Sequence, residues 1–146
     1  MKKLFIYYSL TSNGDLVAKT LEKSCDIRKI KVKKELPKPF FLRILVGGYK
    51  AISNKKEKLV GFNNDISNYN EIIIGSPIWN DRLSTPVTTV LDLLDLDNKK
   101  LTFILYSGSG QANTAAEYIK TNYKKANIIY LQEPKKYEKE LDKLKI

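Results

Sequence analysis

Three short runs of apolar residues, each followed at once by small and polar residues, constrain the fold of this chain most. They are Leu4–Tyr8, Glu71–Ser76 and Leu101–Tyr106, and they are rich in β-branched or aromatic side chains. A continuous apolar run of this length is typical of a strand that is buried on both faces, as in a parallel sheet. Such a sheet needs long crossover connections, because tight turns cannot join parallel strands.

Residues with helical periodicity occupy the segments between these runs. Residues 85–95 are expected to form one helix, with Thr85 as its N-cap and Pro86 in its first turn. The apolar segment FFLRILVGGYKAI, residues 40–52, is also expected to be helical despite its two adjacent glycines. The side chains that recur at helical spacing are Val17, Leu21 and Cys25; Val87, Val90, Leu91 and Leu94; Ala115, Ala116, Ile119 and Tyr123; and Tyr137, Leu141 and Leu144.

Two further segments complete the predicted sheet. In IRKIKVK, residues 27–33, Ile30 and Val32 alternate with lysines, which predicts an edge strand with one face in water. Asn127–Leu131 predicts the last strand. We therefore predict an α/β fold with a doubly wound, five-stranded parallel sheet in the order 2-1-3-4-5, because this order places the alternating strand at an edge. The 146 residues are expected to form a single domain.

Side-chain composition narrows the chemistry available to the chain. It has no histidine, which excludes zinc sites and triads built on histidine as well as imidazole acid–base catalysis. Cys25 is the only cysteine, so an intrachain disulfide is excluded and we expect a buried structural thiol. The 26 lysines and arginines exceed the 16 acidic residues and give a net charge of +10. This excess indicates either a biased background composition or acidic partners.

The sequence also bears on where the protein resides. The basic start MKKLFIYYSL contains only a short apolar run, and no cleavage site of small residues follows it. No segment approaches the ~20 apolar residues of a membrane span. A cytoplasmic location without a membrane span is therefore expected.

The carboxyl ends of the first, third and fourth predicted strands carry residues suited to binding a ligand. Ligands of doubly wound sheets bind outside these ends, at the point where the strand order reverses. The loop SLTSNGD, Ser9–Asp15, precedes a helix whose N-terminal N–H groups favour an anion. Its hydroxyls are suited either to a phosphate or only to capping the helix. A Walker loop is excluded, because the required Gly-Lys-Ser/Thr is absent.

The other two loops suit a flat ring. In GSPIWNDRLSTP, residues 75–86, Trp79 is the only tryptophan of the chain. It is either a platform for a ring or a side chain packed onto neighbouring helices. The glycine-rich loop SGSGQ, residues 107–111, offers an opposite wall, and it is not a dinucleotide fingerprint because Asn113 stands where that pattern needs Gly or Ala. Together the loops indicate a ligand with one phosphate and a flat ring system.

These motifs resemble those of the flavodoxin family. IYYSLTSNGDLVA is similar to the family's phosphate loop, IIIGSPIWNDRLSTPV to the Gly-x-Pro-x-Trp segment of short bacterial flavodoxin-like proteins, and LYSGSGQA takes the place of the third flavin loop. The resemblance implies FMN as the cofactor. By position, Ser9, Thr11, Ser12, Asn13 and Gly14 would hold the phosphate; Pro77, Ile78, Trp79 and Asn80 would line the isoalloxazine ring; and Ser107, Gly108, Ser109 and Gly110 would close its other side.

The phosphate loop departs from the family pattern at three positions. Ser12 stands where glycine is usual, and Gly14 stands where threonine is usual. Asp15 would repel a phosphate by on the order of a kcal/mol or more, unless it turns away as a cap of the first helical turn.

The resemblance implies an FMN-binding electron-transfer protein that carries electrons between redox partner proteins, which the net charge of +10 predicts to be acidic. One alternative is a small FMN-dependent NAD(P)H or quinone reductase. Another is a flavodoxin-like module that has lost FMN and acts as a basic binding partner. Nucleic acid is not the expected partner, because the basic residues are spread along the chain without interleaved aromatics. No catalytic side chain and no metal site is predicted, and both the oligomeric state and an enzymatic activity are left open.

Overall fold

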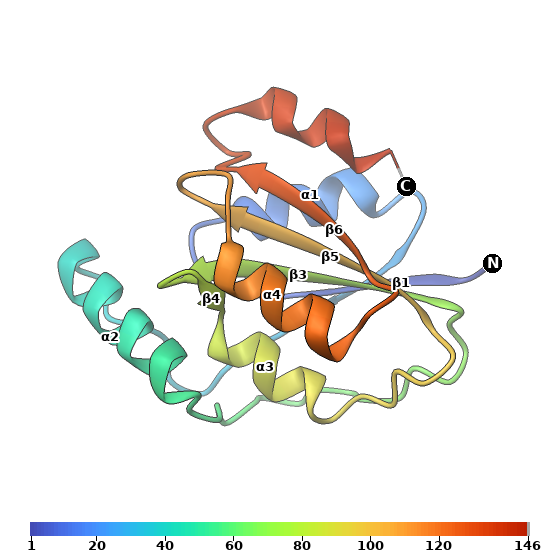
Figure 1. The fold of residues 1–146 in the computed structure, drawn as a ribbon, viewed down its shortest axis with the longest axis horizontal. Coiled ribbons are helices and arrows are strands. Elements are labelled where there is room, and N and C mark those ends of the chain that lie inside the picture. The colour runs from blue at the N-terminus through green and yellow to red at the C-terminus, as the bar shows by residue number, and fades with distance from the viewer. Residues whose placement is uncertain (146) are drawn as a thin grey trace.

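The computed structural model describes residues 1–145 and confirms the predicted α/β fold (Figure 1). Its parallel sheet has the order β2-β1-β3-β5-β6, which is the predicted order 2-1-3-4-5 once a short additional strand is set aside. That additional strand, β4, pairs antiparallel with β3 and lies off the main path. The strands are β1 (Lys3–Tyr7), β2 (Asp26–Lys29), β3 (Glu71–Trp79), β4 (Arg82–Leu83), β5 (Lys100–Ser107) and β6 (Asn127–Gln132).

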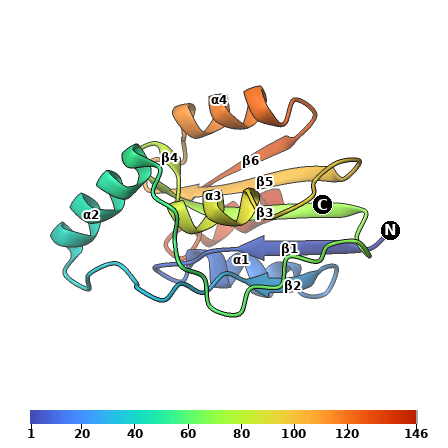
Figure 2. The same ribbon diagram turned by 90° about the horizontal axis from the view of Figure 1, so that it is seen from below.

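Helices cover both faces of the sheet (Figures 1 and 2). The helix α1 (Asn13–Leu21) and the 3-10 helix η1 (Glu138–Leu144) pack on one face, while α3 (Thr85–Leu91) and α4 (Asn113–Asn122) pack on the other. Alternate residues of the central strands enter the two resulting cores, and this double burial explains why their sequences are apolar without interruption.

The predicted helix at residues 40–52 is confirmed as α2 (Phe40–Ser53), but it covers neither face of the sheet. It lies beyond the carboxyl ends of the strands and projects from the body of the molecule (Figure 2). Of its residues, only Gly47 and Ala51 are buried. This helix therefore stands beside the edge where the predicted ligand site lies.

The second strand was predicted too long. β2 ends at Lys29, although the Ile30 N–H still donates to the Tyr7 carbonyl at 2.7 Å. Val32 lies outside the sheet and forms an isolated antiparallel bridge with Leu59. The predicted edge position is confirmed, since β2 pairs only with β1 within the described residues. Ile30 and Val32 are buried as their alternation predicted.

The helix at residues 85–95 was also predicted with the wrong ends. Ser84 is the N-cap in place of Thr85, which is the first helical residue. The helix ends at Leu91, because the chain tightens into a turn in which the Leu93 N–H donates to the Val90 carbonyl at 2.9 Å. The C-terminal helix likewise exists but is of the tighter 3-10 type.

Cys25 is buried, as predicted, although it follows α1 rather than ending it. Within residues 1–145, no helix combines the length and the apolar composition that crossing a membrane requires.

Candidate cofactor-binding site

Parallel pairing brings the three predicted loops to one edge of the sheet. β1 and β3 pair through Tyr7 opposite Gly75, and β3 and β5 pair through Pro77 opposite Tyr106. The segments that follow these residues therefore begin side by side, at the switch between β1 and β3 where the strand order reverses.

The side chain that caps helix α1 is that of Ser9, not that of Ser12 at the helix boundary. Ser12 is the N-cap of α1, yet its side chain makes no capping hydrogen bond. Instead the Ser9 Oγ accepts a hydrogen bond from the Gly14 N–H at 3.1 Å, while its own O–H can still donate. Thr11 and Ser12 are exposed. The loop thus caps its helix through one serine and leaves two hydroxyls facing solvent at the helix N-terminus.

Ser12 adopts a left-handed backbone conformation with φ of 69°. Glycine takes this conformation without strain, whereas a residue with a Cβ does so at a cost. This geometry accounts for the glycine that similar loops carry at the same place. The departure at Ser12 therefore preserves the backbone path of the loop and adds a hydroxyl.

Gly14 is required by packing rather than by the approach of a ligand. A Cβ added to it would lie 2.5 Å from the Tyr106 Oη and 2.9 Å from the Tyr7 Cδ2. Tyr106 cannot easily move away, because it is buried and its hydroxyl donates to the Tyr8 carbonyl. The glycine consequently lets α1 pack closely on β1 and β5.

Asp15 is held by neighbouring strands. Its carboxylate accepts hydrogen bonds from the Tyr7 hydroxyl at 2.8 Å and from the Lys29 Nζ at 2.7 Å. Partial burial would raise the pKa of Asp15, but the bonds from Lys29 and Tyr7 outweigh it and hold the pKa below the ordinary value. Its charge is thus neutralised by Lys29, which relieves the repulsion that the sequence predicted toward a phosphate.

The second loop differs from its prediction, because β3 runs through Pro77, Ile78 and Trp79 before the chain turns. Asn80 and Asp81 both have positive φ, of 48° and 61°, and they join β3 to β4 as a tight hairpin. Two adjacent residues that tolerate positive φ are a hairpin signal that the sequence carried.

Trp79 is buried, with 8% of its surface exposed, and it is the last residue of β3 rather than part of the loop in which it was predicted. Its ring meets Tyr8 edge to face at a centroid distance of 5.9 Å. On another side it faces Gly47 of α2, where an added Cβ would lie 3.5 Å from the indole. Of the two interpretations of Trp79, the structure favours packing under a helix.

A hollow of about 220 Å³ nevertheless separates α2 from the hairpin. Arg43 and Ile44 of α2 line one side of it. The opposite side is lined by residues of the first two loops, namely Leu10, Ile78, Trp79 and Asn80. The structure thus gathers three of the four predicted ring-lining residues around one cavity.

Asp81 has a role that the sequence did not reveal. Its carboxylate accepts hydrogen bonds from the backbone N–H and the hydroxyl of Thr114, at 2.9 and 2.7 Å. These bonds lower the pKa of Asp81 below its ordinary value. They fix the hairpin to the start of α4.

Hydrogen bonds hold the third loop in place, while its backbone at Gly108 is exposed to solvent. The Ser107 hydroxyl donates to the Gln111 carbonyl at 2.9 Å, and the Gln132 side chain donates to the Gly108 carbonyl at 3.2 Å. Gly110 has φ of +73°, which glycine adopts readily. Gly108 is exposed, and a Cβ added there would meet no atom within 4 Å. A flat group could therefore approach the backbone at Gly108 and Ser109.

Two lysines stand beside the first loop, and the sequence did not single them out. Lys135 and Lys136 line a hollow of about 380 Å³ together with Thr11, Asn13 and Glu133. The Lys135 N–H also donates to the Asn13 Oδ1 at 3.0 Å. These residues follow β6, so only the folded sheet brings them to the first loop. One hydroxyl, a helix N-terminus and two cations against one carboxylate leave this hollow with an excess of positive charge, which fits a phosphate.

The strand order and this edge of the sheet place the protein in the flavodoxin-like α/β class. Within that class, the chain belongs to the family of NADPH-dependent FMN reductases, whose model matches residues 1–134. The family match confirms FMN as the cofactor that the sequence resemblance implied. The individual residues assigned to FMN remain predictions.

Solved structures of low sequence identity share the fold. A flavoprotein structure from Bacteroides eggerthii has a TM-score of 0.74 at 19% identity, covering 99% of this chain and 98% of its own. The flavoprotein from Lactobacillus acidophilus in complex with FMN has a TM-score of 0.68 at 20% identity, covering 94% and 97%. An FMN-dependent NADH-azoreductase from Bacillus anthracis has a TM-score of 0.51 at 12% identity, covering 99% and 95%. A comparison with curated proteins gave no match.

Proposed function

We propose that this protein is an FMN-dependent NAD(P)H reductase whose flavin binds at the carboxyl edge of the sheet. The observation that carries the proposal is the family match over residues 1–134, because that range contains all three loops. The similar folds of an FMN-bound flavoprotein and an FMN-dependent NADH-azoreductase support it. Of the functions considered from the sequence, the reductase is therefore favoured over a pure electron carrier, and FMN binding disfavours a module without flavin.

The exposed hydroxyls of Thr11 and Ser12, with the N-terminal N–H groups of α1, would hold the FMN phosphate. Lys135, which lines the same hollow, would balance its charge.

The ring would lie between the two other loops. Ile78 and Asn80 would contact it on the hairpin side, and Gly108 and Ser109 would approach it from the third loop, where no side chain blocks the glycine. When bound, FMN supplies the hydride and electron transfer, so the protein needs no histidine or other general acid. The residues of the chain then bind and orient the flavin and exclude water from one of its faces.

An electron carrier is the second candidate, and the net charge of +10 is the observation that favours it. A positive surface would attract acidic redox partner proteins. The two candidates share the flavin site and differ in whether reduced nicotinamide reacts with it directly. The cytoplasm, where reduced nicotinamides are available, remains the proposed location.

The test is steady-state oxidation of NADPH, and then of NADH, by the FMN-loaded protein with a quinone as acceptor. A reductase consumes the nicotinamide at a rate proportional to protein concentration. A carrier does so only when a separate reductase is added, and that result would overturn the proposal.

A pair of variants ties the activity to the phosphate loop. Thr11→Glu places a carboxylate beside the phosphate, and at an effective dielectric constant of ~20 this costs up to about 4 kcal/mol. We expect at least a tenfold loss of FMN affinity. Thr20→Glu adds the same charge at the exposed far end of α1 and should leave the affinity unchanged. Equal affinities of the two variants would contradict the assigned phosphate site.

A further inference from the structure

The excess positive charge of the chain comes almost entirely from one segment. Residues 27–62 contain 11 lysines and arginines and only two acidic residues, so they carry +9 of the net charge of +10. Basic residues occur elsewhere too, but there acidic residues balance them. The segment includes most of β2, all of α2 and the connections on either side of this helix. A charge gathered in this way creates a positive field over one part of the surface.

The fold brings the two connections together as a short antiparallel ribbon. Val32 forms a bridge with Leu59. Beside this bridge, the Lys33 N–H donates to the Lys58 carbonyl at 2.8 Å. Side chains alternate between the two faces of a strand, so the burial of Val32 turns its neighbours Lys31 and Lys33 outward. We call four exposed lysines the basic ribbon: Lys31, Lys33, Lys34 and Lys58.

The basic ribbon holds positive charge that the molecule does not compensate. Lys33 and Lys58 lie directly opposite each other, and like charges at such positions destabilise the pairing of strands. Within residues 1–145, none of the four lysines forms an ion pair. Of the two acidic residues in the segment, Glu57 is largely buried in another ion pair, and the Glu35 carboxylate accepts a hydrogen bond from the buried Tyr8 hydroxyl. An acidic partner would relieve this repulsion.

The basic ribbon also stands beside the proposed flavin site. β2 ends at Lys29, so the ribbon follows at the carboxyl edge of the sheet. Leu36, two residues after Lys34, lines the hollow between α2 and the hairpin together with Ile78 and Asn80. A molecule bound to the ribbon therefore lies next to the hollow in which the ring is expected.

From these observations we propose that the basic ribbon is the docking surface for a small acidic electron-carrier protein. The proposal rests on the proposed flavin site, but not on whether reduced nicotinamide reacts there. An acidic surface complements the charge of the ribbon, which steers the partner toward it and orients it. Docking beside the hollow brings the redox centre of such a partner close to the flavin.

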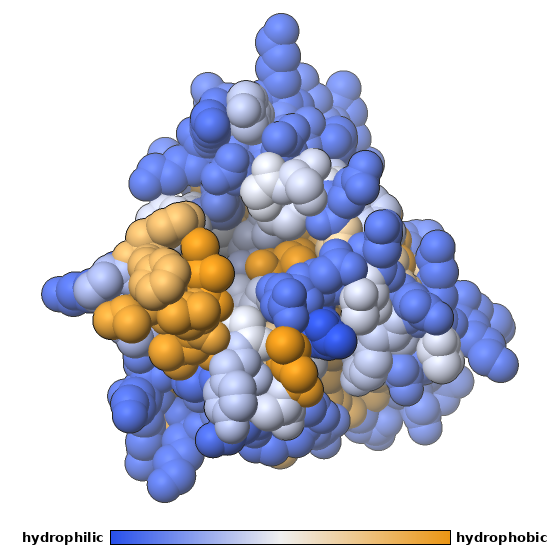
Figure 3. Space-filling model, turned by 60° about the vertical axis from the view of Figure 1, so that its left-hand side comes forward, coloured by the Kyte–Doolittle hydropathy of each residue, from blue (hydrophilic) through white to orange (hydrophobic). Residues whose placement is uncertain are grey.

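Two other kinds of polyanion match the ribbon less well. Single-stranded nucleic acid binds on aromatic side chains that stack with its bases, whereas the exposed apolar residue of the ribbon is Val60. An anionic lipid surface would chiefly use the hydrophobic patch on α2, which Figure 3 shows bordered by hydrophilic residues. Neither gains from a place beside the flavin, whereas an electron carrier needs it.

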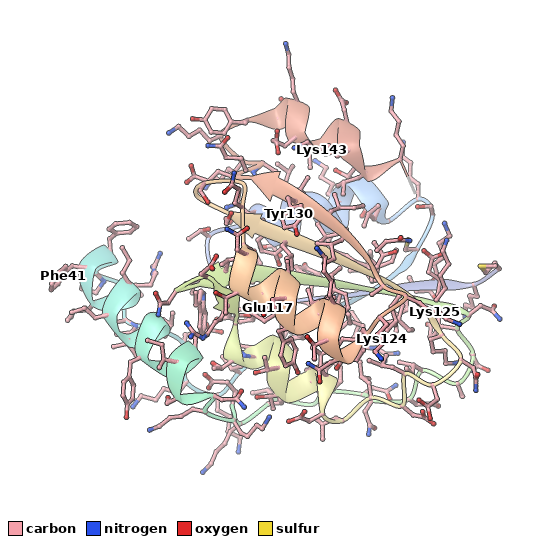
Figure 4. All side chains as sticks on the ribbon, in the orientation of Figure 1. Phe41, Glu117, Lys124, Lys125, Tyr130 and Lys143 are labelled. Carbon is pink, nitrogen blue, oxygen red and sulfur yellow. The ribbon has the colours of Figure 1, made fainter. Side chains whose placement is uncertain are left out.

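The experiment is isothermal titration calorimetry of the FMN-loaded chain with an oxidised [2Fe–2S] ferredoxin of acidic surface, at low ionic strength. The variants are Lys33→Glu and its control Lys124→Glu, which makes the same charge change at the opposite end of the sheet (Figure 4). We expect wild type and Lys124→Glu to bind the ferredoxin alike, and the Kd of Lys33→Glu to rise at least about tenfold. Added salt should weaken the wild-type complex.

Lys33→Glu is not expected to act by unfolding the protein. It replaces the like-charge pair with Lys58 by a pair of opposite charges, so thermal unfolding should occur no earlier than in wild type. Lost binding in a variant of undiminished stability thus reports on docking.

Absence of ferredoxin binding at low ionic strength would overturn the proposal. Equal losses in the two variants would do so as well, because the net charge alone would then explain the binding. The same titrations are made with oligouridylate and with phosphatidylserine-containing vesicles. A Lys33-dependent affinity for either of these that exceeds the affinity for ferredoxin would assign the ribbon to that polyanion and overturn the proposal. Failure of NADPH to reduce the flavin would count against the reductase activity alone, because the titrations contain no nicotinamide.

Discussion

Replacing Gly14 by alanine is expected to destabilise the protein before any flavin is considered. The added methyl group would lie 2.5 Å from the Tyr106 Oη, 2.9 Å from the Ser9 Cβ and 2.9 Å from the Tyr7 Cδ2. Overpacking of this kind costs about 1–3 kcal/mol. Alanine also stabilises the helix by about 0.5–1 kcal/mol relative to glycine, which offsets part of this cost. The difference between these ranges is roughly 0–2.5 kcal/mol. Because Tyr106 is fixed by burial and by its bond to the Tyr8 carbonyl, we expect a net loss in the upper part of that range, about 1–2 kcal/mol.

The assay is urea unfolding of the flavin-free protein, followed by far-UV circular dichroism. For a chain of this size, 1 kcal/mol corresponds to roughly 2–4 °C in Tm, so thermal unfolding should show the same loss as a decrease of roughly 2–8 °C.

Gly108→Ala is the matched control, because an added Cβ at that position meets nothing within 4 Å. Its free energy of unfolding should stay within ~0.5 kcal/mol of wild type. If Gly14→Ala proved as stable as the control, α1 would not approach β1 and β5 as closely as described, and the packing argument would be refuted.

Three further outcomes are expected at the same edge of the sheet. Gly108→Ala should weaken FMN binding several-fold in a fluorescence titration although its stability is unchanged; an unaltered affinity would remove Gly108 from the site. Lys135→Ala should weaken FMN binding at low salt and less so at high salt, where charges are screened. Lys124, which Figure 4 shows at the opposite end of the sheet, is its control, and equal losses would contradict the assignment. Because the pKa of Asp15 is lowered on folding, its carboxylate stabilises the protein above its ordinary pKa of about 3.9 and loses this effect as pH falls through the lowered value. The stability difference between wild type and Asp15→Asn should therefore shrink from pH 7 to pH 3, and an undiminished difference would contradict the ion pair with Lys29.

The sheet was predictable because a strand that lies between two hydrophobic cores is apolar at every position. Leu4 and Ile6 enter one core while Phe5 and Tyr7 enter the other, so the strand is apolar throughout. The lysines of the second strand were equally informative, because in a parallel sheet that helices cover on both faces a water-exposed strand face is expected only at an edge.

Residues whose position depends on distant contacts could not be predicted. The sequence left open whether Trp79 forms a platform or packs onto a helix, and it is the contact of α2 with the β3–β4 hairpin that buries it. Lys135 lies more than a hundred residues from Asn13, and only the order of the strands brings them together. The neutralising contact between Asp15 and Lys29 is likewise tertiary.

The α2 segment shows a further limit of periodicity. Its apolar residues correctly predicted a helix, but an apolar pattern ordinarily marks the side that faces the core. Here Gly47 and Ala51 face the body and the large side chains face outward. The side of α2 that faces the body is the one whose Gly47 packs against Trp79 and whose Lys50 pairs with Glu57.

The proposed reductase activity is tested most directly by mixing the FMN-loaded protein with a stoichiometric amount of NADPH under anaerobic conditions and recording the flavin absorption band. A reductase is expected to bleach this band within seconds and to recover it when a quinone is added. A band that NADPH and NADH both leave unchanged, in a protein that still holds FMN, would contradict the assignment and leave the chain as an electron carrier.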